Sequence, residues 1–343
     1  MGVVSRILGF CLISAVLALS GAPASAQATL AAVKKRGQLN CGVNDDLPPF
    51  SFLNDKKERV GFDVDYCKAI AAATLGDASK VNFVKLSFAK RFDALKSGEV
   101  DVLVRHSIIT MDRTAAGTGV RAAAVTYIDG QAFVVPRTAN VTRLPNLDKQ
   151  TICLTNNTPH RANVENWFSL RGLTLQVQAF DDQDQMYKAF FDGKCTAVTQ
   201  EATTLAQTII ATGKAANYIM LPEIISREPV GPYVKAGDDQ WLDIVHWIQN
   251  AMIEAEERGV SQVTVADQRN SKDPEVRRLL GTDPGNGKVL GLDESWAYNV
   301  IKQVGNYSDV YERNLGVGSP LKFGRGINGL WQKGGVMYSM PMR

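Results

Sequence analysis

Hydrophobic and polar residues follow one another along this chain with the periods of helices and short buried strands. The clearest example is residues 91–113, RFDALKSGEVDVLVRHSIITMDR. An apolar helix face is followed by Gly98, which is typical of a helix C-terminus. The apolar run 100–104 then predicts a buried strand, and a polar loop ends at Arg113. Ligands bind at the carboxyl ends of strands in open α/β sheets, so this loop is a candidate binding site. Taken alone, Arg113 also fits an ordinary surface arginine.

The rest of the chain predicts an alternation of strands and helices. The predicted strands occupy residues 38–43, 81–86, 127–135, 151–154, 173–179 and 218–221. The predicted helices occupy residues 30–37, 61–75, 163–170 and 238–257, and short helices are expected in 259–343. Asp63 or Asp65 is a candidate cap for the second of these helices, which ends before Gly76.

A short internal repeat indicates two lobes built on one plan. ALKSGEVDV at residues 94–102 and AFFDGKCTA at 189–197 both join a helix end, a glycine, a charged residue and a strand start, although so short a match also arises by chance. Pro136 with Arg137, and the stretch 228–232, are the expected crossing points between lobes. We therefore expect an α/β protein in which residues 27–135 and 230–270 form lobe 1, residues 136–229 form lobe 2, and residues 271–343 form an extension packed on lobe 1.

The N-terminus has the pattern of an export signal. Arg6 supplies the charged region, residues 7–19 the apolar core, and Ala24-Ser25-Ala26 a small-residue cleavage site, so residues 1–26 are predicted to be a signal peptide. The apolar run is short for a membrane span, and a retained N-terminal anchor is the alternative. We expect a protein of the periplasm.

Charge and cysteine usage fit an exported globular protein. The formal net charge of +3 leaves no basic footprint for nucleic acid. Cys11 lies in the predicted signal, and four cysteines remain, none with zinc-type spacing: Cys41, Cys67, Cys153 and Cys195. Four cysteines allow three pairings. If the chain has two lobes, only Cys41–Cys67 with Cys153–Cys195 keeps each disulfide inside one lobe.

The remaining chemistry indicates a binding cleft rather than a reaction centre. No nucleotide-binding, serine-hydrolase or zinc-protease motif occurs, so we expect no cofactor and no metal. His106 and His160 lie in the two candidate cleft loops, where lobe closure could bring them together, but a catalytic pair is disfavoured. A zwitterion fits better: Arg113 would bind its carboxylate and Glu201 its ammonium group. Glu201 also fits an acid that merely stabilises a helix N-terminus.

Several motifs resemble one known family. They are GFDVDYCKAIA, the run RFDAL…SGEVDVL…T-x-x-R, and the tail segments LPEIISREPVGPYVKAGDDQWLDIVHW, WAYNVIKQVGNYSDVYERNLG and SPLKFGRGINGLWQKGGVMY. The chain resembles the bacterial extracellular solute-binding proteins of family 3, which serve polar amino-acid ABC transporters, and within them the general L-amino-acid-binding proteins of α-proteobacterial type.

This resemblance implies a type II periplasmic binding protein, with two α/β lobes joined by two hinge strands and the ligand between them. It implies that Arg113 holds the ligand carboxylate, that Phe92 packs on the ligand, and that Glu201, where aspartate is usual, holds the ammonium group. It also implies the disulfides Cys41–Cys67 and Cys153–Cys195. The remaining residues expected at the ligand are Asn44, Leu47, Ser107, Ile108, Thr158 and His160.

The sequence departs from the family pattern mainly within the expected site. Ile108 stands where a hydroxyl residue is usual, and Asn157-Thr158-Pro159 replaces the usual G-T-T, which removes one backbone N–H donor. Glu201 is one methylene longer than aspartate. These changes favour, as an alternative, a changed ligand such as a modified or opine-like amino acid.

The expected function is transport rather than catalysis. The protein would bind an amino acid or a related zwitterion by hinge closure, act as a monomer, and deliver the ligand to an inner-membrane ABC permease. The alternative from another class is an enzyme of the cyclohexadienyl-dehydratase type on the same scaffold, with Glu201 or His160 as its general acid.

Overall fold

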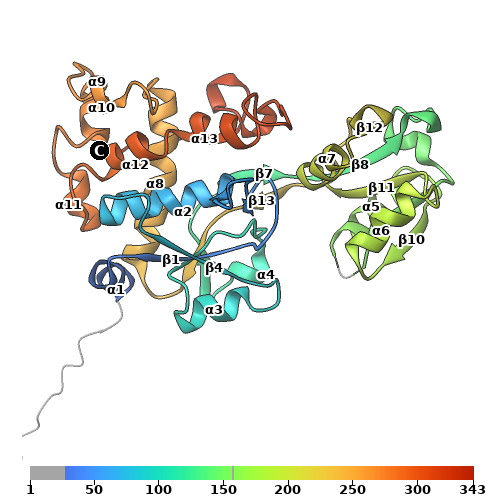
Figure 1. Ribbon diagram of the computed structural model, residues 1–343, viewed down its shortest axis with the longest axis horizontal. Helices are drawn as coiled ribbons and strands as arrows, with labels where there is room; N and C mark the ends of the chain where they lie inside the picture. Colours follow the sequence, from blue (N-terminus) through green and yellow to red (C-terminus); the bar gives the residue numbers. More distant parts are fainter. Residues whose placement is uncertain (1–27, 157) are drawn as a thin grey trace, which may run out of the picture.

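A computed structural model describes residues 28–156 and 158–343 as two lobes joined by a pair of strands (Figure 1). The signal peptide predicted at residues 1–26 lies outside the described residues, as does Asn157. The larger lobe contains both the early and the late parts of the chain, and the smaller lobe contains its middle part. No helix within the described residues has the length and apolar character needed to cross a membrane.

Lobe 1 is built on a five-stranded mixed sheet in the order β4-β1-β5-β14-β6. Its strands are β1 (Leu39–Val43), β4 (Val81–Lys85), β5 (Val102–Leu103), β6 (Val120–Ala122) and β14 (Tyr233–Lys235). β1 runs parallel to β4 and β5, whereas β14 is antiparallel to β5 and β6. Because helices cover both faces, β1 is a nearly continuous buried run, as parallel strands usually are. A small hairpin, β2 (Phe52–Leu53) with β3 (Arg59–Val60), precedes the second helix.

Lobe 2 repeats the same plan in its own five-stranded sheet, in the order β10-β9-β11-β8-β12. Its strands are β8 (Gln131–Pro136), β9 (Thr151–Thr155), β10 (Gln176–Phe180), β11 (Ala197–Glu201) and β12 (Tyr218–Met220). In both sheets the central βα strand (β1 or β9) lies between two parallel neighbours. On one side, each sheet continues with two strands joined by antiparallel pairing, β14 and β6 in lobe 1 and β8 and β12 in lobe 2. The helix–glycine–strand repeat in the sequence corresponds to α3–β5 in one lobe and α6–β11 in the other.

Helices cover both sheets. Those of lobe 1 are α1 (Ala28–Arg36), α2 (Phe62–Leu75), α3 (Arg91–Ser97), α4 (Met111–Thr114) and α8 (Asp239–Glu257). Those of lobe 2 are α5 (His160–Ser169), α6 (Gln183–Phe191) and α7 (Ala202–Ala211), with the short 3₁₀ helices η1 (Arg137–Ala139), η2 (Leu144–Leu147) and η3 (Ala215–Asn217). Gly76 ends α2 in the left-handed conformation that glycine adopts without steric cost. Neither Asp63 nor Asp65 caps this helix: Asp63 is buried, and the Asp65 carboxylate accepts from Arg313 and Asn314.

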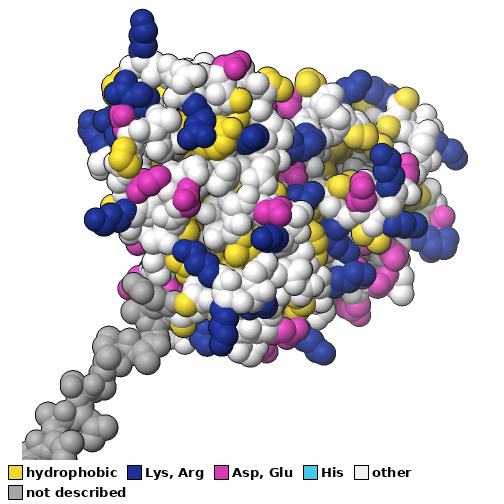
Figure 2. All heavy atoms as spheres, turned by 60° about the vertical axis from the view of Figure 1, so that its left-hand side comes forward, with side chains coloured by type: hydrophobic (Ala, Val, Ile, Leu, Met, Phe, Trp, Pro, Cys, Tyr) yellow, Lys and Arg dark blue, Asp and Glu magenta, His cyan; other side chains and the backbone are white. Residues whose placement is uncertain are grey.

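The C-terminal part of the chain lies against lobe 1 on the side of α2 and α8 (Figure 1). It contains α9 (Val265–Gln268), α10 (Pro274–Leu279), α11 (Asn286–Leu290), α12 (Trp296–Gln303), α13 (Tyr307–Asn314), η4 (Gly326–Asn328) and η5 (Trp331–Lys333). Apolar side chains of α12 and α13, including the fully buried Trp296 and Tyr307, belong to the same hydrophobic core as α2 and α8. Lysine, arginine and acidic side chains are interspersed over the surface drawn in Figure 2.

Two antiparallel strands, β7 (Tyr127–Asp129) and β13 (Glu228–Val230), connect the lobes (Figure 1). The structure moves the predicted lobe boundary. The apolar run 127–135 is interrupted at Gly130, and the part after it is β8, which pairs with β11 and β12 in lobe 2. The chain therefore crosses at β7, ahead of the predicted crossing at Pro136, because an apolar run does not reveal which sheet completes its hydrogen bonds. We propose β7 and β13 as the boundaries between the lobes.

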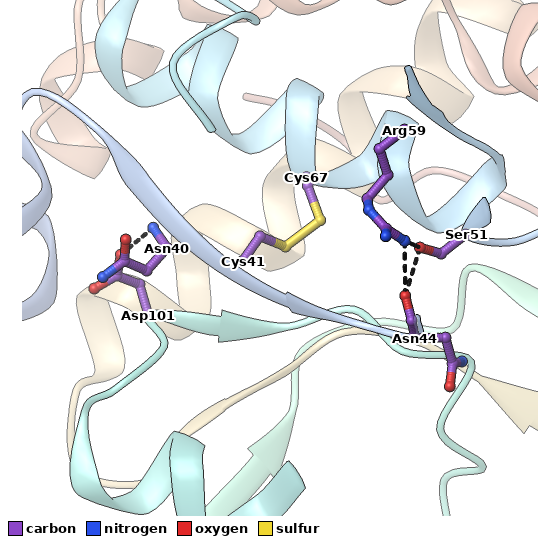
Figure 3. The surroundings of a disulfide bond; sticks show 7 residues. All are labelled: Asn40, Cys41, Asn44, Ser51, Arg59, Cys67 and Asp101. Carbon is purple, nitrogen blue, oxygen red and sulfur yellow. Dashed lines mark hydrogen bonds between the residues drawn. A yellow bond between two sulfur atoms is a disulfide. The ribbon is translucent and has the colours of Figure 1, made fainter. Parts of the chain in front are cut away.

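Each lobe contains one disulfide. Cys41 of β1 is bonded to Cys67 of α2, as Figure 3 shows, and Cys153 of β9 is bonded to Cys195, just before β11. This is the pairing that the family resemblance implied. Neither disulfide joins one lobe to the other.

The extension also reaches the first crossing strand. The amide of Asn328, which is 3% exposed, accepts from the Ile128 N–H at 2.7 Å and donates to the Ile128 carbonyl at 2.9 Å. The Asn328 carbonyl accepts from Arg325, whose guanidinium forms a two-pronged ion pair with Glu256 of α8. One edge of β7 is thus paired with β13, and the other with a side chain of the extension.

Candidate functional site

An open pocket of about 650 Å³ lies between the lobes, beside the second crossing strand. Its lining comes from the loop after β5 and α4 in lobe 1, from the start of α5 in lobe 2, and from the approach to β13. These residues are Ile108, Thr110, Arg113, Pro159, Asn163, Ile224, Ile225, Ser226, Arg227 and Glu228. The volume falls within the range of small-molecule sites, and movement about β7 and β13 would change the separation of its walls.

Arg113 provides a cation in this pocket. It is half-buried in α4, and its Nη1 donates to the carbonyl of Ile108 at 2.9 Å. The Tyr233 hydroxyl donates to the same carbonyl at 2.8 Å. Arg113 forms no ion pair with any carboxylate among the described residues. Its remaining N–H groups therefore suit a carboxylate ligand, which a guanidinium binds with two parallel hydrogen bonds.

The loop before Arg113 is fastened to the second crossing strand. Ile108 forms a β-bridge with Val230, and the N–H of Ile109 donates to the Pro229 carbonyl at 2.7 Å. Ile108 lines the pocket, whereas Ser107 is buried with its hydroxyl donating to the Arg105 carbonyl at 3.4 Å. A hydroxyl expected at the ligand thus points into the protein in this conformation, and Thr110 is the hydroxyl residue of this loop that lines the pocket.

The other lobe 1 candidates are not among the residues that line the pocket. Phe92 is half-buried, with its ring at 5.2 Å from that of Tyr233 in an edge-on arrangement. The Asn44 side chain donates to the Arg105 carbonyl at 3.2 Å, and it points away from Arg59, which holds the Asn44 backbone carbonyl (Figure 3). Leu47 forms a tight turn with Ser51 and packs against the core of lobe 1.

On the lobe 2 side, the structure forms a pair that the sequence analysis did not predict. His160 Nε2 lies 3.2 Å from Glu201 Oε1, with side chains only 4% and 17% exposed. Burial alone would raise the pKa of Glu201, but the hydrogen bond and charge of His160 outweigh burial and leave that pKa lowered. Glu201 thus has a hydrogen-bonding neighbour within its own lobe. Thr158 donates to the Thr155 carbonyl at 2.9 Å, and Asn157 is not among the described residues.

His106 lies beside Asp129 of the first crossing strand, whereas His160 contacts Glu201. Its ring is stacked on Phe50, with centroids 3.7 Å apart, and Nε2 lies 3.6 Å from Asp129 Oδ2. Burial lowers the pKa of His106, and the carboxylates of Asp129 and Asp63 more than reverse that effect, so the pKa is raised. Asp63 is buried beside it, and burial raises the pKa of Asp63 to about 6. His106 and His160 therefore contact different carboxylates in this conformation.

Sequence reasoning missed part of the pocket. Asn163 and residues 224–228 line the pocket, but no sequence motif marks them. The path of the chain at residues 224–228 is set by the pairing of β13 with β7, which the sequence does not reveal. No cluster of metal-ligating side chains occurs in residues 28–156 and 158–343.

Two lobes built on similar mixed sheets, two crossing strands and a pocket between them define the class of periplasmic binding proteins of type II. Residues 39–260 match the family described as bacterial extracellular solute-binding proteins, family 3, and the chain belongs to that family.

Similar proteins cover almost the whole chain. It is 42% identical to the general L-amino acid-binding periplasmic protein AapJ of Rhizobium johnstonii over 99% of both chains. It is 40% identical to the glutamate/glutamine/aspartate/asparagine-binding protein BztA of Rhodobacter capsulatus, over 96% of this chain and 98% of that protein. A solved periplasmic binding protein of Brucella ovis with glutathione bound is 40% identical, with a TM-score of 0.85 over 92% of this chain and 99% of that chain.

Proposed function

We propose that this protein is the periplasmic solute-binding component of an ABC transporter, and that it binds an amino acid or a related zwitterion between its lobes. The observation that carries the proposal is Arg113, a guanidinium without an ion pair among the described residues, in a pocket formed by both lobes at the crossing strands. Relatives that match the chain over nearly its full length are named as amino-acid-binding proteins, which supports this function.

In the proposed mechanism, Arg113 binds the ligand carboxylate, and closure about β7 and β13 brings lobe 2 onto the ligand. Glu201 then receives the ammonium group, while His160 holds the Glu201 carboxylate in position. Phe92, Leu47, Asn44 and the loops at 107–108 and 158 form the walls of the closed site. Desolvation on closure strengthens each charged contact, because the surrounding dielectric falls.

A changed ligand is the second candidate. Ile108 lines the pocket where a hydroxyl residue is usual, and Glu201 is already paired with His160. The solved relative from Brucella ovis holds glutathione, so ligands larger than a single amino acid belong in any screen. The related proteins are named as binding proteins, and we propose that this protein likewise carries out no chemical step.

We further propose that the protein acts in the periplasm as a monomer and delivers its ligand to an inner-membrane permease. The permease would contact the outer rims of both lobes, because only the closed form presents these rims at a fixed spacing. The protein would need no cofactor and no nucleic acid for this function.

A binding screen tests the proposal. The purified protein is heated with each of the twenty amino acids and with glutathione, since a bound ligand raises the melting temperature by mass action. Arg113→Ala should abolish the response to any carboxylate ligand that the screen finds. Arg121→Ala is the matched control, because Arg121 is an exposed arginine of the same lobe. Unchanged affinity of Arg113→Ala in calorimetry would refute the assignment of the site.

A further inference from the structure

One buried carboxylate beside the crossing strands is contacted from both lobes. Asp129 is the last residue of β7 and is 5% exposed. On the lobe 2 side, its Oδ1 accepts from the N–H of Gly130 at 2.8 Å, and its Oδ2 accepts from the hydroxyl of Thr203 in α7. On the lobe 1 side, Nε2 of His106 lies 3.6 Å from the same Oδ2. The Asp129 side chain therefore joins the two lobes at the place where they would rotate.

The partners of Asp129 are held by different lobes. The ring of His106 is stacked on Phe50, which is buried in the core of lobe 1. Thr203 is fully buried at the start of α7 in lobe 2. Because Asp129 is bonded to Thr203 while His106 is fixed to lobe 1, a rotation of lobe 2 about the crossing strands changes the separation of His106 from Asp129.

The strength of the contact between His106 and Asp129 depends on a proton. The two side chains are only 9% and 1% exposed, so water does little to screen the attraction between their charges. Neither ring nitrogen of His106 has a hydrogen-bonding partner among the described residues, and Asp129 is the carboxylate that its Nε2 meets. An ion pair exists here when the imidazole is protonated, and it is absent when the imidazole is neutral.

Acids from several elements act on the charge of His106. Burial is the largest influence and lowers its pKa, but the contact with Asp129 and the charges of Asp63 and Glu201 raise that pKa above the ordinary value of 6.5. The ion pair is thus present in full below pH 6.5 and is lost as the pH rises through the raised pKa. The titratable and charged groups around His106 are Asp63 of α2, Arg105 of the same loop, Tyr127 and Asp129 of β7, Glu201 at the end of β11, His160 beside Glu201, and Glu228 opposite Asp129 in β13.

A bound ligand would act on the same proton in two ways. Closure would move Asp129 with lobe 2 and so disturb its contact with His106. In the proposed function, Glu201 also receives the ammonium group of the ligand. Glu201 is one of the acids that favour the charged form of His106, and a cation bound to it would cancel that influence.

We infer that His106 is a pH-sensitive contact of the hinge: its protonated form holds Asp129 in the arrangement of the lobes described above, and closure on a ligand releases the proton. This inference rests on the proposed function and adds regulation by pH to it. Because such coupling is reciprocal, the ligand should bind more weakly as the pH falls. A displacement of the His106 pKa by one unit corresponds to about a tenfold change in affinity.

The titration of His106 tests the contact without any ligand. The chain has three histidines, so NMR resolves their Cε1–H signals, and His106→Gln assigns the signal of His106. We expect the pKa of His106 to lie above 6.5 in the wild type. It should be lower in Asp129→Asn, which keeps the size of the side chain and removes its charge; if that variant does not fold, Asp129→Ser removes the same charge. A pKa at or below 6.5, or an equal pKa in the folded variant, would overturn the inference.

Calorimetry then measures the coupling to a ligand. The probes are L-glutamine and L-alanine, whose own charges stay constant between about pH 5.5 and about pH 8. For the wild type we expect the affinity to be about three- to tenfold lower at the acidic end, with protons released on binding. His106→Gln should lose most of this pH dependence and of the proton release. His246→Gln is the matched control and should keep both, because His246 lies in α8 and contacts the Ala123 carbonyl instead.

The inference and the proposed function fail in different ways. Equal affinity of the wild type at both pH values, or the same pH dependence in His106→Gln as in the wild type, would overturn the inference and leave the proposed function standing. No response to any ligand in the melting screen would refute the proposed function. If neither probe binds, the NMR titration of His106 in the wild type and in Asp129→Asn decides on the contact.

Discussion

The contact between Asn328 and the first crossing strand gives a sharp prediction about stability. The substitution Asn328→Leu keeps the approximate size of the side chain but removes its acceptor and its donor. The Ile128 N–H and carbonyl would then lose their partners at 2.7 and 2.9 Å, on the edge of β7 that β13 does not cover.

The magnitude follows from the number of groups left without a partner. An unsatisfied buried polar group costs about 1–3 kcal/mol, so two such groups cost about 2–6 kcal/mol. Ile128 is only half-buried, which lets water replace part of the loss. We therefore expect the free energy of unfolding to fall by about 2–3 kcal/mol.

Guanidinium chloride unfolding measures the global effect, and hydrogen exchange of the peptide that contains β7 measures the local one. The amide of Ile128 should exchange faster in Asn328→Leu than in the wild type. Ile327→Ala is the matched control, because Ile327 is the neighbouring residue and is 43% exposed. A loss below about 0.5 kcal/mol, with unchanged exchange at Ile128, would refute the reasoning.

Three further predictions concern the crossing region, lobe 2 and the core. A Cβ at Gly231 would overlap the carbonyl oxygen of Ala124. Gly231→Ala should therefore lower the free energy of unfolding, measured by urea titration, by about 1–3 kcal/mol. An unchanged free energy of unfolding would mean that the two segments separate freely. Because the pKa of Glu201 is lowered in the fold, its pairing with His160 stabilises the protein above the ordinary pKa of 4.5 and is lost as the pH falls through the lowered value. Glu201→Gln should therefore flatten the decrease in melting temperature on acidification. If the melting temperature of Glu201→Gln fell as steeply with pH as that of the wild type, the stabilising role of the charged Glu201 would be refuted. Trp296 is 1% exposed, and Trp296→Ala should cost about 3–5 kcal/mol in the same titration; a loss under about 1 kcal/mol would place it outside the core.

Local patterns predicted most helices and strands within a few residues. The helix expected at 238–257 is α8 (Asp239–Glu257), because the Asp238 side chain caps it by accepting from Trp241 N at 3.1 Å and its apolar stripe has a regular period. The same patterns did not reveal partners distant in sequence. The run 127–135 read as one strand, and only the pairing of β8 with β11 and β12 separates it from β7.

The sequence likewise predicted only the parts of the candidate site that follow from a local pattern. Arg113 and Ile108 stand at the carboxyl end of a predicted strand and do line the interlobe pocket. The pairing of His160 with Glu201 joins residues on different elements, and neither residue alone indicates it.

The pairing of β7 with β13 also bears on how such a chain is assembled. Asp129 lies opposite Glu228, so lobe 2 leaves lobe 1 and returns to it at neighbouring positions. The whole lobe replaces what would otherwise be the turn of a β-hairpin. A two-residue Asn-Gly link between Asp129 and Glu228 would meet the geometry of a tight hairpin turn. With the boundaries proposed above, lobe 2 is an insertion in lobe 1, held between two strands that pair with each other.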